Sequence, residues 1–346
     1  MSLLRRNSAL RAIAGACALI AALAAPATTP AGPEVIFYAP HSGEIRRASE
    51  MPRPTQQQIN ERTIFRGRSL TANVVYLDSP GVGFNDNTVG ADRRAVMTAV
   101  LAYIDSVLDH PAGVLDVEVQ PSETDASGFL ATAGTFYFAV NGFFPGFAFD
   151  HITSGFDPSG TNPDIGVTVD FGYPWNNDTG PCGLSEYDLY SVLLHEITHG
   201  LGIASLTNSA GQSAFLTPFS TNTFTSFDDL LREVSPSRRV WNATTQAFEA
   251  TALNEGNDSI IFEGTEAENV LGFFPPIYTP ATFAPGSSVG HWQFDPPTPP
   301  GAVMHWVFFF GQEKRVYEPF ELGALQDLGY SIVTTPTAAE GWQLYH

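Results

Sequence analysis

The chain has 346 residues, of which 43% are hydrophobic and 15% are charged. This composition argues against a disordered protein and predicts a globular chain, folded as one large domain or as two lobes. Acidic residues outnumber Lys and Arg by 36 to 16, which gives a formal net charge of −20 at pH 7. Nucleic acids and anionic membrane surfaces would repel such a chain, so we expect neither as a partner.

The first thirty residues have the layout of a secretory signal peptide. Arg5, Arg6 and Arg11 precede an apolar run over residues 12–25, and small residues and prolines follow it. We therefore interpret residues 1–30 as a signal peptide and expect a secreted protein, either extracellular or periplasmic. The alternatives are a membrane anchor, for which the run is short, and a lipoprotein signal around Cys17. No later segment is apolar enough to predict stable membrane insertion.

Residues 31–69 are polar, rich in Pro, Gln and Arg, and show no hydrophobic period. They are interpreted as an N-terminal extension or a pro-segment, with regular structure beginning near residue 70. Removal of the signal peptide would leave Cys182 as the only cysteine, so an internal disulfide is excluded. We expect Cys182 to be an unpaired, half-buried residue.

Strands and helices are expected to mix along the first half of the chain. Apolar residues that recur at intervals of three and four predict an amphipathic helix over residues 92–108. Alternating, β-branched or aromatic stretches predict strands at 73–77, 115–119, 135–140 and 166–171.

The most informative passage is YDLYSVLLHEITHGLGIAS, residues 187–205. Its apolar residues form a helical stripe, and on that helix His195 and His199 lie four residues apart, so both imidazoles project from one face. Zn²⁺ prefers neutral imidazole nitrogens in a tetrahedral set, and a catalytic site keeps one position for water. Glu196 lies beside that position and is the expected catalytic base. Gly200 and Gly202 are expected to end the helix.

The third ligand of a zinc site is not next to this motif. In the extended pattern HExxHxxGxxH a third His follows the glycine, but here that position is Ser205, a poor zinc ligand. Two possibilities remain from the residues alone. One is a carboxylate from Asp228, Asp229 or Glu233 on a predicted helix, and the other is a distant histidine such as His291 or His305.

Four motifs, taken in order, resemble the leishmanolysin-like metzincins and related secreted bacterial peptidases. They are HEITHGLGI, SSVGHW, AVMHW and ALQDLGY, and the resemblance covers about residues 70–332. It implies that His291 is the third zinc ligand and that Met304 forms a floor under the metal. This chain departs from the family in the proline-rich stretch 296–300 and in having His305 directly after Met304.

The resemblance also implies the fold and the function. We expect an α+β, metzincin-like catalytic domain of two lobes, with a mixed sheet, an active-site helix and a mostly irregular C-terminal lobe. The lobes would span residues 70–202 and 203–346. The implied protein is a monomeric zinc metalloendopeptidase in which Glu196 activates water to hydrolyse a protein or peptide substrate. The alternative is a catalytically inactive binding or adhesion protein on the same scaffold.

The substrate rim is also suggested by the resemblance. Residues 163–171 resemble the strand that pairs with an extended peptide in zincins, although the same residues would suit an ordinary sheet strand. The group that stabilises the oxyanion is not identified, because Tyr317 and Tyr330 are only tyrosines in the appropriate half of the chain.

Overall fold

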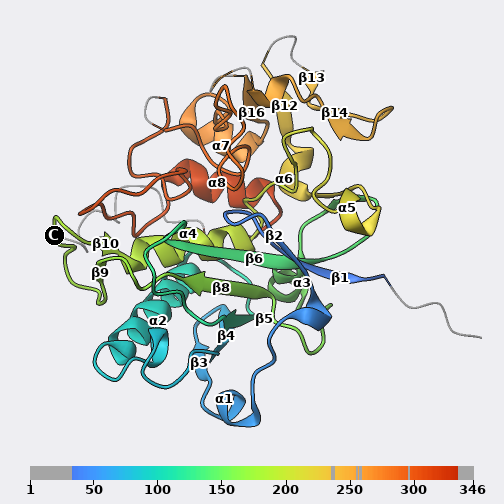
Figure 1. Ribbon diagram of the computed structural model, residues 1–346. Helices are drawn as coiled ribbons and strands as arrows, with labels where there is room; N and C mark the ends of the chain where they lie inside the picture. Colours follow the sequence, from blue (N-terminus) through green and yellow to red (C-terminus); the bar gives the residue numbers. More distant parts are fainter. Residues whose placement is uncertain (1–32, 235–237, 255, 257–258, 295–296, 334–346) are drawn as a thin grey trace, which may run out of the picture. The chain divides into compact units, whose positions relative to one another are not determined.

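A seven-stranded mixed sheet is the central feature of the computed structural model (Figure 1). The structure describes residues 33–234, 238–254, 256, 259–294 and 297–333, so the predicted signal peptide and Cys17 lie outside the described residues. The strand order is β2-β1-β6-β8-β5-β4-β3. Strands β4, β5 and β8 are parallel to one another, and every other neighbouring pair is antiparallel. The expected α+β class and mixed sheet are confirmed.

The strands of this sheet include those predicted after residue 70. They are β1 Val35–Ala39, β2 Glu44–Arg47, β3 Thr63–Arg66, β4 Leu70–Tyr76, β5 Gly113–Val119, β6 Ala131–Phe138 and β8 Ile165–Val169. In β4, buried and half-buried residues alternate, as a strand with one face on a core requires. Central β8 is buried at four of its five positions, as expected for a strand covered on both faces.

Two long helices pack together and against the main core. The helices are α1 Gln56–Asn60, α2 Gly90–Val107, α3 Phe147–Ser154, α4 Leu189–Gly200, α5 Leu216–Phe219, α6 Ser226–Asp229, α7 Thr265–Leu271 and α8 Pro319–Asp327, with 3₁₀ turns η1 Ala48–Glu50, η2 Gly83–Asn85 and η3 Ala252–Asn254. Helix α2 buries Val96, Val100 and Ile104 of its predicted apolar stripe, whereas Ala95 is exposed. Helix α4 contacts α2, β6 and β8. None of the described helices is both long and apolar enough to cross a membrane.

Short elements dominate the chain after α4, which Figure 1 colours from yellow to red. The remaining strands are β7 Gly142–Phe144, β9 Trp175–Asn176, β10 Tyr187–Asp188, β11 Thr223–Thr225, β12 Leu231–Glu233, β13 Arg238–Arg239, β14 Trp241–Asn242, β15 Ala247–Phe248 and β16 Ile260–Phe262. Beyond α4, no described strand is longer than three residues and no described helix is longer than nine. Cys182 is half-buried and forms no disulfide, as predicted.

The expectation that regular structure begins near residue 70 is wrong. Strands β1 and β2 form a hairpin, and β1 pairs along β6 in the main sheet. The side chains of Ile36, Phe37 and Ala39 are at most 3% exposed, because β1 packs apolar residues on both of its faces. A short run buried on both faces shows no amphipathic period, which is why periodicity did not reveal it.

The suggested substrate rim at residues 163–171 is also wrong. Strand β8 lies inside the sheet, paired to β5 on one side and to β6 on the other. Its backbone hydrogen-bonding groups face strands on both sides, so an added peptide cannot pair with it. On the side of β8 away from β5 lies β6, and β1 pairs with the other side of β6.

Helix α4 is anchored at its start and closely packed at its end. The Asp188 side chain accepts a hydrogen bond from the backbone N–H of Ser191, a standard N-cap, and Arg315 donates two hydrogen bonds to the same carboxylate. At the other end, a Cβ added to Gly200 would overlap the Ile165 side chain of β8. Gly200 therefore lets the helix approach the sheet closely.

We predict that Gly200→Ala destabilises the protein by about 1–2 kcal/mol, because overpacking against the fully buried Ile165 outweighs the better helix propensity of alanine. Urea unfolding would measure the change. Gly290→Ala is the matched control, since the nearest atom to its added Cβ is 3.6 Å away, and we expect a change below about 0.5 kcal/mol. Equal stability of Gly200→Ala and the unmodified chain would contradict the close packing.

Candidate metal centre

Helix α4 presents two imidazoles to the same point. His195 and His199 lie one turn apart on this helix, and their Nε2 atoms are 3.1 Å apart. Their rings are nearly perpendicular, at 89°, with centroids 4.7 Å apart. The helical spacing seen in the sequence therefore brings both rings together, as predicted.

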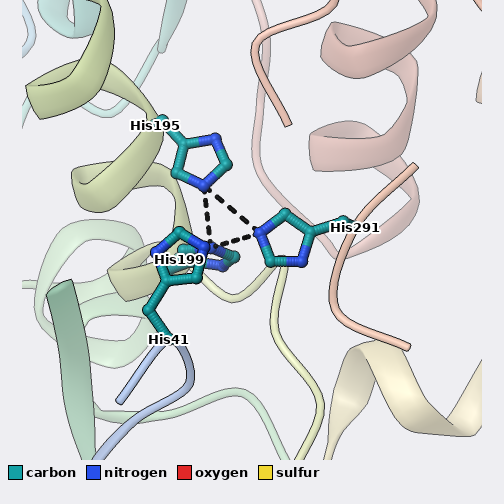
Figure 2. Close-up of side chains that lie close together, drawn as sticks. All are labelled: His41, His195, His199 and His291. Carbon is teal, nitrogen blue, oxygen red and sulfur yellow. Dashed lines mark hydrogen bonds between the residues drawn. The ribbon is translucent and has the colours of Figure 1, made fainter. Parts of the chain in front are cut away.

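His291 completes a group of three imidazoles. It lies far along the chain, in the turn-rich segment before Trp292, and its Nε2 is 3.1 Å from that of His199 and 3.3 Å from that of His195. Figure 2 shows the three rings pointing toward one another, with His41 beside them. The structure thus brings together the three residues predicted as ligands. We call His195, His199 and His291 the histidine triad.

Each ring of the triad is oriented by a backbone carbonyl. The Nδ1 atoms of His195, His199 and His291 lie 2.8, 2.7 and 2.7 Å from the carbonyl oxygens of Val303, Ile203 and Ser287, respectively. A carbonyl only accepts, so each Nδ1 donates its hydrogen and each neutral Nε2 carries a lone pair. The short Nε2 contacts are therefore contacts between three lone pairs, which a cation placed between them would stabilise.

The spacing of the triad fits a tetrahedral metal site. For Zn–N distances of about 2.0–2.1 Å, two ligands of a tetrahedron are about 3.3–3.4 Å apart. The observed separations of 3.1, 3.1 and 3.3 Å are close to that value. The triad supplies three of the four ligands of such a site, the number of protein ligands in catalytic zinc sites.

Burial keeps the triad neutral. The three side chains are at most 1% exposed. Burial lowers the pKa of His199 to about 4 and the pKa values of His195 and His291 well below the usual value for histidine. Neutral imidazole is the form that binds metals, so this environment favours a ligand role.

Glu196 lies next to the triad with one oxygen unpartnered. The side chain is 2% exposed, and its Oε1 is 2.9 Å from Nδ1 of His41. Its Oε2 is buried and has no hydrogen-bond partner. A buried carboxylate oxygen without a partner is costly, so it marks a position for a further polar group such as water.

His41 is the residue of this site that sequence reasoning missed. One of its ring nitrogens and the three Nε2 atoms of the triad all lie within 4.8 Å of one another. Its ring centroid is 5.1, 5.1 and 4.9 Å from those of His195, His199 and His291. The sequence analysis assigned His41 to a polar extension, and no local motif around it indicates a metal site. Only the hairpin that carries it brings it here.

His305 and Asp228, two of the alternative third ligands, form hydrogen bonds with groups outside the triad. His305 places Nε2 2.8 Å from the Thr298 hydroxyl and Nδ1 3.2 Å from the Lys314 amine, and it is not part of the metal-capable histidine group. Asp228 accepts hydrogen bonds from the Ser205 hydroxyl and from the backbone N–H groups of Leu206 and Thr225.

The helix predicted to carry Asp228, Asp229 and Glu233 is shorter than expected. Helix α6 ends at Asp229, and Glu233 lies on β12. No carboxylate belongs to the metal-capable group around the triad in the described part of the chain.

A buried glutamate holds together the loops that carry the site. Glu321 of α8 accepts hydrogen bonds from the backbone N–H groups of Val303 and Met304 and from the indole of Trp292. Burial raises the pKa of Glu321 to about 7, against the lowering effect of its hydrogen bonds. Val303 orients His195, and Trp292 follows His291, so Glu321 supports two of the three ligands indirectly.

Met304 and the two tyrosines named in the sequence analysis are structural neighbours of the site. Met304 is fully buried in the main core, next to Val303. The Tyr317 hydroxyl is 2.6 Å from the Thr198 hydroxyl, and the Tyr330 hydroxyl donates to the carbonyl of Leu201. Both tyrosines thus bond to α4 or to its C-cap, and each is buried.

Comparison with known proteins adds no relative to this description. No family model matches the sequence, and neither a curated protein nor a solved structure matches the chain.

We predict that His291→Gln weakens Zn²⁺ binding by more than about 100-fold, because loss of a ligand exceeds the 10–100-fold effect of losing an outer partner. His305→Gln is the matched control, since it removes an equally buried histidine that lies outside the triad, and we expect it to retain the metal. Equilibrium dialysis with metal analysis would measure both variants. Loss of zinc from His305→Gln alone would contradict the assignment of the triad.

We predict that Glu321→Ala lowers the free energy of unfolding by about 3–5 kcal/mol, because it leaves several buried N–H donors without an acceptor. It should also weaken Zn²⁺ binding by about 10–100-fold, since two ligand loops lose their support. Urea unfolding and equilibrium dialysis would measure the two effects. Asp92→Ala removes an exposed carboxylate of α2 and should change neither quantity appreciably.

Proposed function

We propose that this protein is a zinc-dependent endopeptidase with Glu196 as its general base. The observation that carries the proposal is the unpartnered, buried Oε2 of Glu196 beside a triad of neutral imidazoles. Three histidine ligands and an adjacent carboxylate are the residues that metal-assisted hydrolysis requires.

Zinc is the metal that this ligand set suits best. The ligands are three uncharged nitrogen atoms at tetrahedral spacing, without the oxygen ligands that Mg²⁺ and Ca²⁺ prefer. When bound, Zn²⁺ would polarise a substrate carbonyl and lower the pKa of a coordinated water toward 7.

Glu196 supplies the proton transfers of the proposed reaction. Its Oε2 accepts a proton from water as the water oxygen bonds to the carbonyl carbon of the scissile peptide. The protonated Glu196 then donates that proton to the leaving nitrogen as the C–N bond breaks. The products are a carboxylic acid and an amine, which become a carboxylate and an ammonium group at neutral pH, and no covalent intermediate with the protein is needed.

We further propose that the chain is a secreted, monomeric, leishmanolysin-like metzincin with two lobes. The order of HEITH, GHW and Met304 along the chain supports this assignment. The contrast between the regular elements up to α4 and the short elements after it is consistent with it. The alternative, a binding protein without catalysis, gives no role to the unpartnered oxygen of Glu196.

We predict that Glu196→Gln lowers the rate of peptide hydrolysis by at least about 100-fold, the lower end of a general base's contribution, while Zn²⁺ binding is kept. Cleavage of casein followed by mass spectrometry, together with metal analysis, would measure both. Glu268 is a half-buried glutamate of α7, and Glu268→Gln is the matched control, which should retain the parent rate. Equal cleavage by Glu196→Gln and the parent chain would rule out this mechanism.

A further inference from the structure

The edge of β6 is occupied by a segment from the start of the described chain. Strand β1 runs antiparallel to β6, with Val35 opposite Phe138 and Tyr38 opposite Thr135. On its other side β6 pairs with β8, which leads into the core of the sheet. An extended peptide that adds to a sheet edge would form the same backbone hydrogen bonds as β1.

The same segment continues from β1 onto the histidine triad. After Ala39 the chain turns through Pro40 to His41, whose side chain is 14% exposed. The His41 ring stacks on Phe129 at 6.0 Å and lies about 5 Å from all three rings of the triad. Its Nδ1 is bonded to Oε1 of Glu196. Glu196 and the triad therefore face the side chain of His41, a residue of the same chain.

Both walls around this segment are shaped to admit a backbone. A Cβ added to Gly134 of β6 would collide with the carbonyl oxygen of Tyr38. A Cβ added to Gly286, in the loop before His291, would collide with the carbonyl oxygen of His41. Gly286 also has a φ of +83°, which favours glycine. At both glycines the backbone of the segment therefore comes too close for a side chain to fit.

Two cavities border the segment around His41. One cavity is lined by Glu196, His41, Phe129, Val192, Trp306 and Phe308. A second borders Pro40, Gly43, Ser205 and Gly286. A peptide that extends beyond the position of His41 therefore has space beside Glu196.

We propose that residues 35–41 occupy the peptide-binding groove of the enzyme in the manner of a substrate, with His41 covering the histidine triad, so that the chain is latent until this segment leaves β6. The proposal rests on the proposed function. It assigns the edge of β6 as the surface that an extended peptide substrate takes in the active form.

The position of His41 favours a blocking role over a role in catalysis. A scissile peptide must lie between Glu196 and the triad, because both act on its carbonyl and nitrogen atoms. The His41 ring lies within about 5 Å of every triad ring and bonds to Glu196, so it fills that space. Strand β1 likewise takes the backbone groups of β6 that a substrate would use.

Replacement of His41 tests whether it covers the metal. In the full chain loaded with Zn²⁺, we expect His41→Ala to raise the rate of zinc removal by a chelator and the affinity for acetohydroxamate at least 10-fold. Hydrolysis of peptides should rise at least 10-fold as well. Ser42→Ala, in the same turn, is the matched control and should leave all three unchanged. Unchanged chelator access with slower hydrolysis would overturn the proposal and make His41 a positioning residue for Glu196.

A reversible lock tests whether β1 must leave β6. Val35 and Phe138 lie opposite each other and are both half-buried, so Val35→Cys/Phe138→Cys can join the strands, with Cys17 and Cys182 replaced by Ser. We expect the oxidised form to hydrolyse peptides at least 10-fold more slowly than the form reduced by a phosphine. Equal rates of the two forms would show that β1 stays in place during catalysis and would overturn the proposal.

The two sets of measurements separate this proposal from the proposed function. Chelator and hydroxamate access report on the groove without requiring hydrolysis. If His41→Ala increases access but neither it nor the parent cleaves peptides, occupancy of the groove stands and the peptidase function fails. If the parent cleaves peptides and neither access nor rate changes in His41→Ala, the function stands and latency fails.

Discussion

Three hydrogen bonds from imidazole Nδ1 atoms to backbone carbonyls are the constraint on which the site depends. They turn the Nε2 lone pairs of the buried side chains His195, His199 and His291 toward one point. The carbonyls come from three separate places in the chain, at Val303, Ile203 and Ser287. Convergence of the ligands therefore requires that the loops around α4 keep fixed positions.

The packing around α4 supplies those fixed positions. Gly200 brings the helix close to β8, Arg315 and Ser191 bind the Asp188 carboxylate at its start, and Tyr330 bonds to the carbonyl of Leu201 just beyond its end. Glu321 joins the loop that follows His291 to the loop that orients His195. A buried carboxylate with several N–H donors can hold irregular backbone where no strand ladder is present. These hydrogen bonds hold the loops after α4 in fixed positions beside the helix.

The N-terminal hairpin connects the sheet to the site. Strand β1 adds to β6 through backbone pairing and buries Ile36 and Phe37, and the turn that follows places His41 beside Glu196. Backbone pairing does not depend on side chains, so the same sheet edge suits either this segment or a peptide of another sequence. If the protein has the proposed function, the edge of β6 binds the substrate in the active form and binds β1 in the latent form.

The sequence by itself determined the local features: strands β4, β5, β6 and β8, helix α2, helix α4 and the four-residue spacing of His195 and His199. These depend on periods of two and 3.6 residues, which are visible in one chain without knowledge of the fold. The resemblance to metzincins identified His291, 92 residues beyond His199, as the expected third ligand. Only the tertiary structure decided that β8 is internal, that His305 and Asp228 bond elsewhere, and that His41 reaches the triad. Sheet order and the meeting of distant loops depend on contacts between residues far apart in sequence, and no local period records them.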